Sequence, residues 1–210
     1  MNEQERAIYL AGAKLERHRH VCAFFHTRDE EYRVLLPFIK EGIERGEKAF
    51  HMVDARLRHE HFQRMAEIGL DVAATEASGQ LEVRDWEEAH LRGDKFDQYA
   101  MLDLVEEVLT NTKSQGFPLT RWVAHMEWSL EDRPGVNDIV EYETRLNHIL
   151  PKYPDPVICT YDLAKFSAST VMDILRTHPL VIIGGILQEN PFFIPPDEFL
   201  QELRRRAQPA

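Results

Sequence analysis

The sequence predicts one α/β domain, a three-layer αβα sandwich with a mostly parallel central sheet. The chain has 210 residues, of which 43% are hydrophobic and 29% charged, which suits one globular domain with a full core. Short apolar runs alternate with longer amphipathic segments along the chain. The runs are almost continuously apolar, as in parallel strands that helices cover on both faces. We therefore expect a single domain over residues 1–210 with its core at about 20–200.

The first predicted element is an N-terminal helix over residues 4–17, where Ile8, Leu10 and Leu15 lie among charged neighbours. The run HVCAFF at 20–25 then predicts a strand. In the following helix, Thr27 is the expected N-cap and Glu30 completes a capping box. Pro37 lies inside this helix, which predicts a kink or a late helix start.

The middle of the chain repeats this order. KAFHMVD at 48–54 predicts a second strand, followed by a helix over 58–68 that Gly69 ends. GQLEVRD at 79–85 predicts a third strand. Residues 96–112 are a predicted helix, because Leu102, Val105 and Leu109 lie on one face with Tyr99. TRWVAHMEW at 120–128 predicts the fourth strand.

The last third continues with a helix over 136–150, a strand at 156–162 and a helix at 167–178 capped by Ser167. PLVIIGG at 179–185 predicts the sixth strand. The tail predicts a short edge element and a C-terminal helix over 196–206, whose first turn carries Pro196 and two acids. Three arginines at 204–206 suit the dipole of its last turn.

Charge and composition exclude several classes of partner. The chain has 25 basic and 36 acidic residues, a formal net charge of −11, which repels nucleic-acid phosphates and anionic lipid. No apolar run approaches the ~20 residues that cross a bilayer, and the N-terminus lacks the pattern of a signal peptide. We expect a cytoplasmic protein with neither nucleic acid nor membrane as direct partner. Cys22 and Cys159 are then expected as free, buried thiols.

The ends of the predicted strands supply the candidate binding residues. In a parallel sheet, ligands bind beyond the carboxyl ends of the strands. An acid there can also cap the next helix, and an aromatic there can belong to the core, so the coincidence of several such residues carries the prediction. The predicted ligand-binding residues are Phe25, His26, Asp54, Glu127, Trp128, Tyr161 and Asp162. We expect a small, largely apolar organic ligand, flanked by mobile loops at 85–94 and 129–136.

The histidine pairs do not predict a metal site. His59 and His61 lie two apart on a predicted helix and so point in different directions. His18 and His20 could share an ion on a strand, but no Cys, Asp or Glu at a suitable spacing completes the set. We therefore predict no metal and no cofactor. For His20 and His178, near the amino ends of strands, hydrogen bonds to loop backbone are expected.

Motifs for catalysis are missing from the sequence. The segment FFHTRDEEY after the first predicted strand has no glycine or lysine, so it lacks a phosphate-binding loop. The chain also has no G-x-S-x-G, C-x-x-C or G-x-G-x-x-G motif. We expect a sensor rather than an enzyme. Two alternatives stay open: an enzyme with Glu127 or Asp54 as general base, and a protein-binding scaffold without a ligand.

An ordered set of motifs gives the chain a family resemblance between about residues 20 and 200. The segments HVCAFF, SGQLEV, HMEWSL, ICTYDLAKF, DILRTHPLVIIGG and ENPFFIPPDEFL together resemble the MEDS domain, the methanogen/methylotroph DcmR sensory domain. The resemblance implies a fold similar to RecA/KaiC-like ATPases without their phosphate loop, and a module that senses small organic compounds. In it, MEW places Glu127 where a related ATPase has an acid after its central strand. The family commonly has Tyr at the position of Phe25 or His26.

The resemblance also implies the partners of the chain. Such domains accompany histidine kinases, anti-sigma-type ATPase domains or DNA-binding segments in prokaryotic signalling. With no output segment recognisable in these 210 residues, we expect the signal to pass to a separate regulatory protein. A homodimer is a further possibility that the sequence leaves open.

Overall fold

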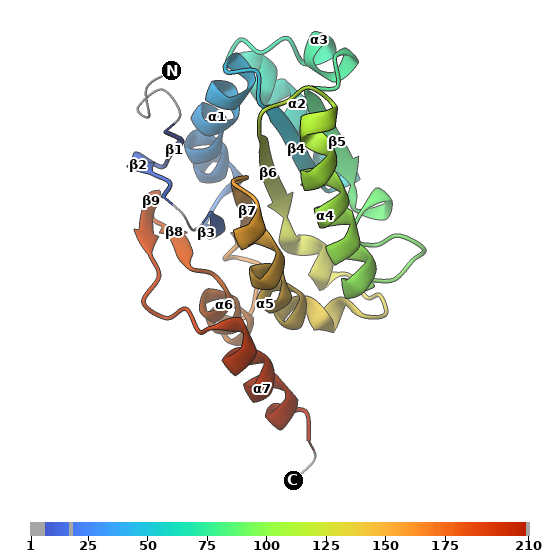
Figure 1. Ribbon diagram of the computed structural model, residues 1–210, viewed down its shortest axis with the longest axis vertical. Coiled ribbons are helices and arrows are strands. Elements are labelled where there is room, and N and C mark those ends of the chain that lie inside the picture. Colours follow the sequence, from blue (N-terminus) through green and yellow to red (C-terminus); the bar gives the residue numbers. More distant parts are fainter. Residues whose placement is uncertain (1–6, 17–18, 209–210) are drawn as a thin grey trace.

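The computed structural model describes residues 7–16 and 19–208 and contains a seven-stranded sheet (Figure 1). The strand order is β5-β4-β6-β7-β3-β8-β9. All neighbours pair in parallel except β9, which is antiparallel to β8 at the edge. The prediction of an α/β fold with a mostly parallel sheet is therefore confirmed.

The six predicted strands are present, and each is followed by helical structure or, for the last, by the edge strand. The six are β3 (His20–Phe25), β4 (Lys48–Val53), β5 (Leu81–Asp85), β6 (Thr120–His125), β7 (Val157–Asp162) and β8 (Leu180–Ile183), and the edge strand is β9 (Ile186–Glu189). The helices are α1 (Arg28–Glu44), α2 (Arg58–Glu67), α3 (Val72–Ala77), α4 (Gln98–Ser114), α5 (Ile139–Ile149), α6 (Ala168–Thr177) and α7 (Pro196–Arg206). Within the described residues, no helix is both long and apolar enough to cross a bilayer.

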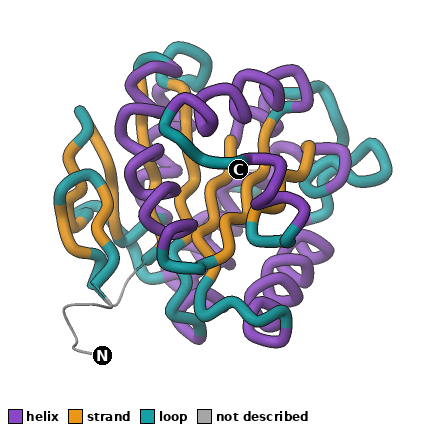
Figure 2. The backbone as a smooth tube through the Cα atoms, turned by 90° about the horizontal axis from the view of Figure 1, so that it is seen from above, coloured by secondary structure: helices purple, strands orange, loops and turns teal. Residues whose placement is uncertain are grey.

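Helices lie on both faces of the sheet (Figure 2) and divide the core in two. Helices α4, α5 and α6 bury one face, and α1 and α2 bury the other. Alternation along a strand assigns each side chain to a face. On β7, for example, Cys159 and Tyr161 belong to the α5 side, whereas Ile158 belongs to the α1 side. Both faces are closed to water, so a polar side chain on a central strand needs a partner inside the protein.

The predicted N-terminal helix over residues 4–17 is wrong within the described residues 7–16. These form a small antiparallel hairpin, β1 (Tyr9–Leu10) and β2 (Ala13–Lys14). Its turn has Ala11 and Gly12 at φ 49° and 78°, the left-handed values of the turn type that matches strand twist. Ile8, Leu10 and Leu15, whose spacing suggested a helix, are instead buried from this hairpin in the α1-side core. Residues 4–6 and 17 of the prediction lie outside the described residues.

The predicted N-caps Thr27 and Ser167 are confirmed, whereas the predicted capping box is not formed, because Glu30 accepts from the residue before the N-cap. The Thr27 hydroxyl accepts a hydrogen bond from the Glu30 amide at 3.2 Å, and the Glu30 carboxylate accepts one from the His26 amide at 2.9 Å. Ser167 caps α6 through the Thr170 amide at 3.2 Å. Helix α1 continues through Pro37 from Arg28 to Glu44, so the alternative of a late start is wrong.

The two loops expected to be mobile are tied to each other. The Phe96 amide donates to the Pro134 carbonyl at 2.8 Å, and Arg133 forms an ion pair with Asp94. Gly135 has a φ of +85°, and a Cβ there would lie 2.1 Å from the Phe96 carbonyl oxygen. Only glycine therefore lets these two loops approach each other.

Replacing Gly135 should destabilise the protein more than replacing a glycine in open space. Gly135→Ala should lower the free energy of unfolding by ~1–2 kcal/mol for left-handed backbone and by ~1–3 kcal/mol more for the clash. Gly116→Ala is the matched control, because Gly116 has a φ of +91° but no atom within 4 Å of the added Cβ. Urea unfolding measures both; equal losses would contradict the close packing of the loops.

A buried histidine should make the protein sensitive to acid. His90 is 2% exposed and stacks on Trp128 with ring centroids 4.6 Å apart, and neither ring nitrogen has a partner among the described residues. Burial lowers the pKa of His90 from 6.5 to about 3. The unfolded chain therefore binds the extra proton first as pH falls. The stability that neutral His90 contributes is complete above pH 6.5 and is lost progressively towards pH 3.

His90→Phe should keep the stack and remove this dependence. Between pH 6.5 and 4 the slope of unfolding free energy against pH should decrease by up to ~1.4 kcal/mol per pH unit. His59→Phe, at an exposed histidine of α2, is the control and should leave the slope unchanged. Urea unfolding at pH 7, 6, 5 and 4 measures the slopes. An unchanged slope in His90→Phe would show that His90 is not held neutral.

Candidate functional site

A hollow of about 590 Å³ lies at the carboxyl ends of the central strands; we call it the strand-exit hollow. Most of its lining side chains are charged. They are Arg28, Asp54, Arg56, Leu57, Glu60, Trp86, Glu127, Leu130, Glu131, Asp162 and Lys165. It is the place at which the parallel-sheet rule predicts a ligand.

The structure brings the three predicted carboxylates together in this hollow. Asp54 follows β4, Glu127 follows β6 and Asp162 ends β7. These strands are consecutive in the sheet order, so their carboxyl ends meet at one edge. Glu127 lies in a short 3₁₀ turn, Met126–Leu130, and is 6% exposed. Whether these residues bind a ligand stays a prediction.

The predicted aromatic residues do not line the hollow. Phe25 packs in the α1-side core at 2% exposure. Trp128 is fully buried on the α5 side, with its ring 4.2 Å from that of Phe96. Tyr161 donates its hydroxyl to Glu143 at 3.1 Å within the same core. His26 is exposed and lies outside the lining. Side-chain alternation directs the strand aromatics into the two cores rather than beyond the strand ends.

The cations of the hollow are all paired with acids. Arg28 contacts Glu31 at 2.6 Å and Glu127 at 3.4 Å. Lys165 lies 3.7 Å from Glu127 and 3.4 Å from Asp162. Strand-end positions do not predict either cation, because Arg28 begins α1 and Lys165 follows the end of β7 by three residues.

Asp54 completes the charge pattern on the other side of the hollow. It accepts from the Arg56 amide at 2.9 Å and pairs with the Arg56 guanidinium at 2.5 Å. Burial alone would raise the pKa of Asp54, but the hydrogen bonds and charge of Arg56 lower it overall. Asp54 is therefore an ionised hydrogen-bond acceptor at neutral pH.

Arg28 also connects the hollow to the interior. Its partner Glu31 is 4% exposed, and its Oε1 lies 3.0 Å from His125 Nε2. Burial would raise the pKa of Glu31, yet the charges and hydrogen bonds of His125 and Arg28 lower it to about 2. A continuous chain of polar contacts thus runs from Glu127 in the hollow through Arg28 and Glu31 to His125 on β6.

A second polar cluster lies inside the α5-side core, away from the carboxyl ends of the strands. It contains four side chains of metal-ligating types, His20, Glu143, Cys159 and His178, all buried. His178 contacts backbone, but the Ile174 carbonyl that it bonds at 3.0 Å belongs to helix α6 and not to a loop as predicted. The expectation of loop backbone as the partner of His20 is wrong, because His20 contacts the side chains of Asn147 and Glu143. Sequence spacing missed the cluster, since its members come from separate elements that only the strand order brings together.

Three comparisons place the chain among known proteins. Residues 19–179 match the model of the MEDS family, the methanogen/methylotroph DcmR sensory domain. The transcriptional repressor DcmR of Methylorubrum extorquens is 26% identical over 170 residues, which cover 80% of this chain and 61% of the repressor. A KaiC-like protein from the archaeon Pyrococcus horikoshii matches with a TM-score of 0.57 and 22% identity, covering 82% of this chain and 73% of that protein.

The structural match confirms the expected fold, a KaiC/RecA-like arrangement, and at 22% identity it speaks for the fold alone. The match to the repressor supports a regulatory role, while the chain spans 61% of the repressor's length. The family model covers most of the described core, from the residue before β3 to the residue before β8. By this match, the chain belongs to the MEDS family of DcmR-type sensory domains.

Proposed function

We propose that this domain is a prokaryotic signal-transduction sensor that binds a small organic molecule in the strand-exit hollow and passes the signal to a separate regulatory protein. The observation that carries the proposal is the convergence of three carboxylates and their paired cations at one hollow of about 590 Å³. The carboxylates follow or end three consecutive strands, β4, β6 and β7, and the cations come from the segments after β4 and β7 and from the start of α1 after β3. Membership of a sensory family supports the same role.

The lining favours a ligand with polar groups over the largely apolar one that the sequence suggested. An apolar molecule would take water from charged side chains such as Glu127 and Asp54 without replacing its hydrogen bonds. A molecule that carries hydrogen-bond donors and acceptors can instead replace one partner of an existing ion pair. The apolar side chains Leu57, Trp86 and Leu130 leave room for a short hydrocarbon portion. We therefore propose a small amphiphilic compound.

Ligand binding in the hollow would directly affect contacts of the protein interior. A ligand that competes for Glu127 would free the Arg28 guanidinium, which also holds buried Glu31 at the start of α1. A signal requires that the ligand prefer one conformation. A thousandfold preference, about 4 kcal/mol, is sufficient to shift such an equilibrium.

We propose that the domain does not catalyse a reaction. The connection from β3 to α1 is only His26 and Thr27, without a glycine, and the first turn of α1 carries Asp29, Glu30 and Glu31. A phosphate cradle at this position needs backbone amides from a glycine-rich loop and a nearby lysine. The same segment instead presents negative charge, which repels a triphosphate.

The output of the signal is proposed from the family. The similar repressor is a transcriptional regulator, and this chain corresponds to part of it. We propose that a regulator, a kinase or an anti-sigma-type protein reads the state of the domain through contact in the cytoplasm.

Native mass spectrometry of the purified protein should reveal a co-purified small molecule, which denaturing mass spectrometry then identifies. Glu127→Gln should weaken binding of that compound by about 10- to 100-fold, which corresponds to ~1.4–2.7 kcal/mol for a lost charged hydrogen bond. Glu131→Gln is the control, because Glu131 lines the same hollow from a more exposed position, 39% for its side chain. Isothermal titration measures both variants.

Two results would contradict the proposal. Equal affinity of Glu127→Gln and wild type for the identified compound would place its site elsewhere. Micromolar binding of magnesium ATP to the wild-type protein would favour an enzyme of the ATPase type over a sensor for organic compounds. Unfolding of Glu127→Gln without ligand, seen by circular dichroism, would instead assign Glu127 a structural role.

A further inference from the structure

The cluster of His20, Glu143, Cys159 and His178 lies where no part of the proposed sensor function needs it. One nitrogen, oxygen or sulfur atom of each residue lies within 4.8 Å of those of the other three. Their exposed fractions are 2%, 0%, 2% and 0%, so water does not solvate them. His20 begins β3, Glu143 lies on α5, Cys159 is central in β7, and His178 directly follows α6.

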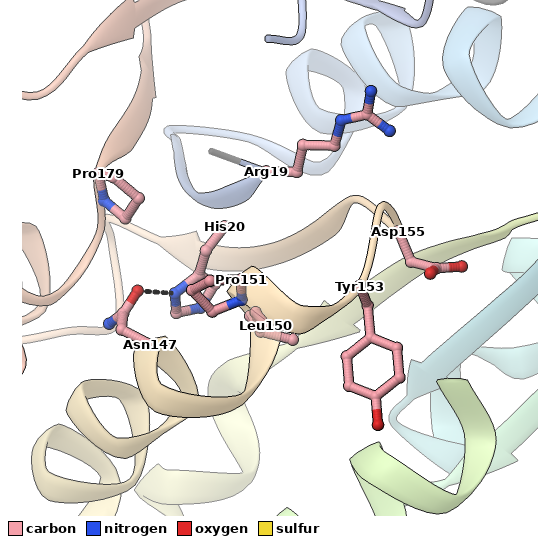
Figure 3. A pocket seen from close by; sticks show the side chains of 8 residues that line it. All are labelled: Arg19, His20, Asn147, Leu150, Pro151, Tyr153, Asp155 and Pro179. Atoms are coloured by element: carbon pink, nitrogen blue, oxygen red, sulfur yellow. Dashed lines mark hydrogen bonds between the residues drawn. The ribbon is translucent and has the colours of Figure 1, made fainter. Parts of the chain in front are cut away.

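The hydrogen bonds of Asn147 fix which nitrogen of His20 carries its proton. The Asn147 amide nitrogen lies 2.7 Å from the Thr177 carbonyl and 3.1 Å from the Glu143 carbonyl, both of which only accept. The amide oxygen therefore faces His20 Nδ1, at 3.0 Å, and receives its proton (Figure 3). In the neutral ring the lone pair is then on Nε2, which points at Glu143 and Cys159.

The same reasoning applies to His178. Its Nδ1 lies 3.0 Å from the Ile174 carbonyl, an acceptor, so Nδ1 carries the proton. Thr177 donates its own hydroxyl to the same carbonyl at 2.8 Å and so can accept from this Nδ1 as well. The Nε2 lone pair of neutral His178 is left facing Glu143 Oε2 at 3.2 Å.

A protein-only arrangement of these groups is unfavourable. Two imidazole lone pairs face Glu143 Oε2, and the Cys159 thiol donates its proton to that same oxygen at 3.7 Å, so both lone pairs lack a donor. Protonating one ring pairs it with Glu143 but leaves the lone pair of the other ring facing the same oxygen. Protonating both rings instead would bury two cations whose ring centroids lie 4.0 Å apart. A divalent cation among the four atoms removes both conflicts, because every converging lone pair becomes a ligand.

We propose that His20 Nε2, His178 Nε2, Glu143 Oε2 and Cys159 Sγ bind one divalent transition-metal ion, for which Zn²⁺ is the best match. Two imidazoles, a carboxylate and a thiolate are ligand types of four-coordinate zinc sites. The outer contacts are those that orient metal ligands: Asn147 and the Ile174 carbonyl hold the histidines, and Tyr161 donates to the free Glu143 oxygen. Binding releases the Cys159 thiol proton to solvent.

A narrow cleft opens beside His20 of the cluster. It has a volume of about 20 Å³ and is lined by His20 and Asn147, with Arg19, Tyr153, Asp155 and Pro179 among the surrounding residues (Figure 3). This space admits a water-sized species beside His20. The cleft lies at the amino end of β3, whereas the strand-exit hollow lies at the carboxyl end. The two sites are therefore distinct.

Metal titration of the full chain tests the proposal. After dialysis against a chelator, competition with a chromophoric chelator should show one tightly bound Zn²⁺ per chain, and Zn²⁺ should raise the melting temperature. Co²⁺ in place of Zn²⁺ should give the visible bands of a four-coordinate site and a thiolate-to-cobalt charge-transfer band. Absence of stoichiometric binding to the wild-type protein would overturn the proposal.

Variants assign the ligands. Cys159→Ser should abolish the charge-transfer band and weaken Zn²⁺ binding more than 100-fold. Cys22→Ser is the matched control, since Cys22 is the other buried thiol and donates to the Leu180 carbonyl at 3.7 Å; it should keep both band and affinity. Asn147→Ala should weaken binding by about 10- to 100-fold through loss of orientation.

The control variant also decides the case if Cys159→Ser does not fold. Folded Cys22→Ser that keeps the charge-transfer band leaves Cys159 as the only thiol in the chain that can supply it. Loss of the band in folded Cys22→Ser would overturn the assignment of Cys159. None of these readouts depends on an organic ligand in the strand-exit hollow, so failure here and failure of the proposed sensor function are distinguishable.

Discussion

The burial of the sheet on both faces is the constraint on which the other features of this protein depend. A polar side chain on a central strand cannot reach water, and an unpartnered one costs several kcal/mol. The helices therefore supply carboxylates to both faces: Glu143 from α5 meets His20 of β3 and Glu31 from α1 meets His125 of β6. Each of these two buried carboxylates contacts several polar side chains. The two resulting clusters are the places in the interior where side chains do more than pack.

The sequence was sufficient to predict the sheet because parallel strands buried on both faces leave nearly continuous apolar runs. It also predicted that Asp54, Glu127 and Asp162 converge, since the carboxyl ends of parallel strands share an edge whatever their order. The same rule wrongly predicted that the aromatic residues would line the hollow. Tyr161 and Phe25 lie within their strands, and for such residues alternation decides the direction of the side chain. The N-terminal hairpin was missed because its short turn at Ala11 and Gly12 interrupts a spacing that also fits a helix.

The buried cluster could not be predicted from spacing, because its residues are 123, 16 and 19 positions apart in the chain, the differences between 20, 143, 159 and 178. Their meeting requires β7 and β8 to flank β3, which places Cys159 beside Cys22 and brings His178, before β8, towards His20. Nothing local in the sequence sets that order. A helix register on α5 must also direct Glu143 and Asn147, one turn apart, to the same histidine.

Strand β7 takes part in both sites, since Cys159 belongs to the cluster and Asp162, three residues later, lines the hollow about 10 Å along the strand. Parallel ladders to β6 and β3 hold β7 on both sides, so it cannot slide by itself. Any coupling between the sites would therefore have to use side chains that reorient without breaking the ladder. Tyr161 is the candidate for such a side chain, because it directly precedes Asp162 and donates its hydroxyl to Glu143 of the cluster at 3.1 Å.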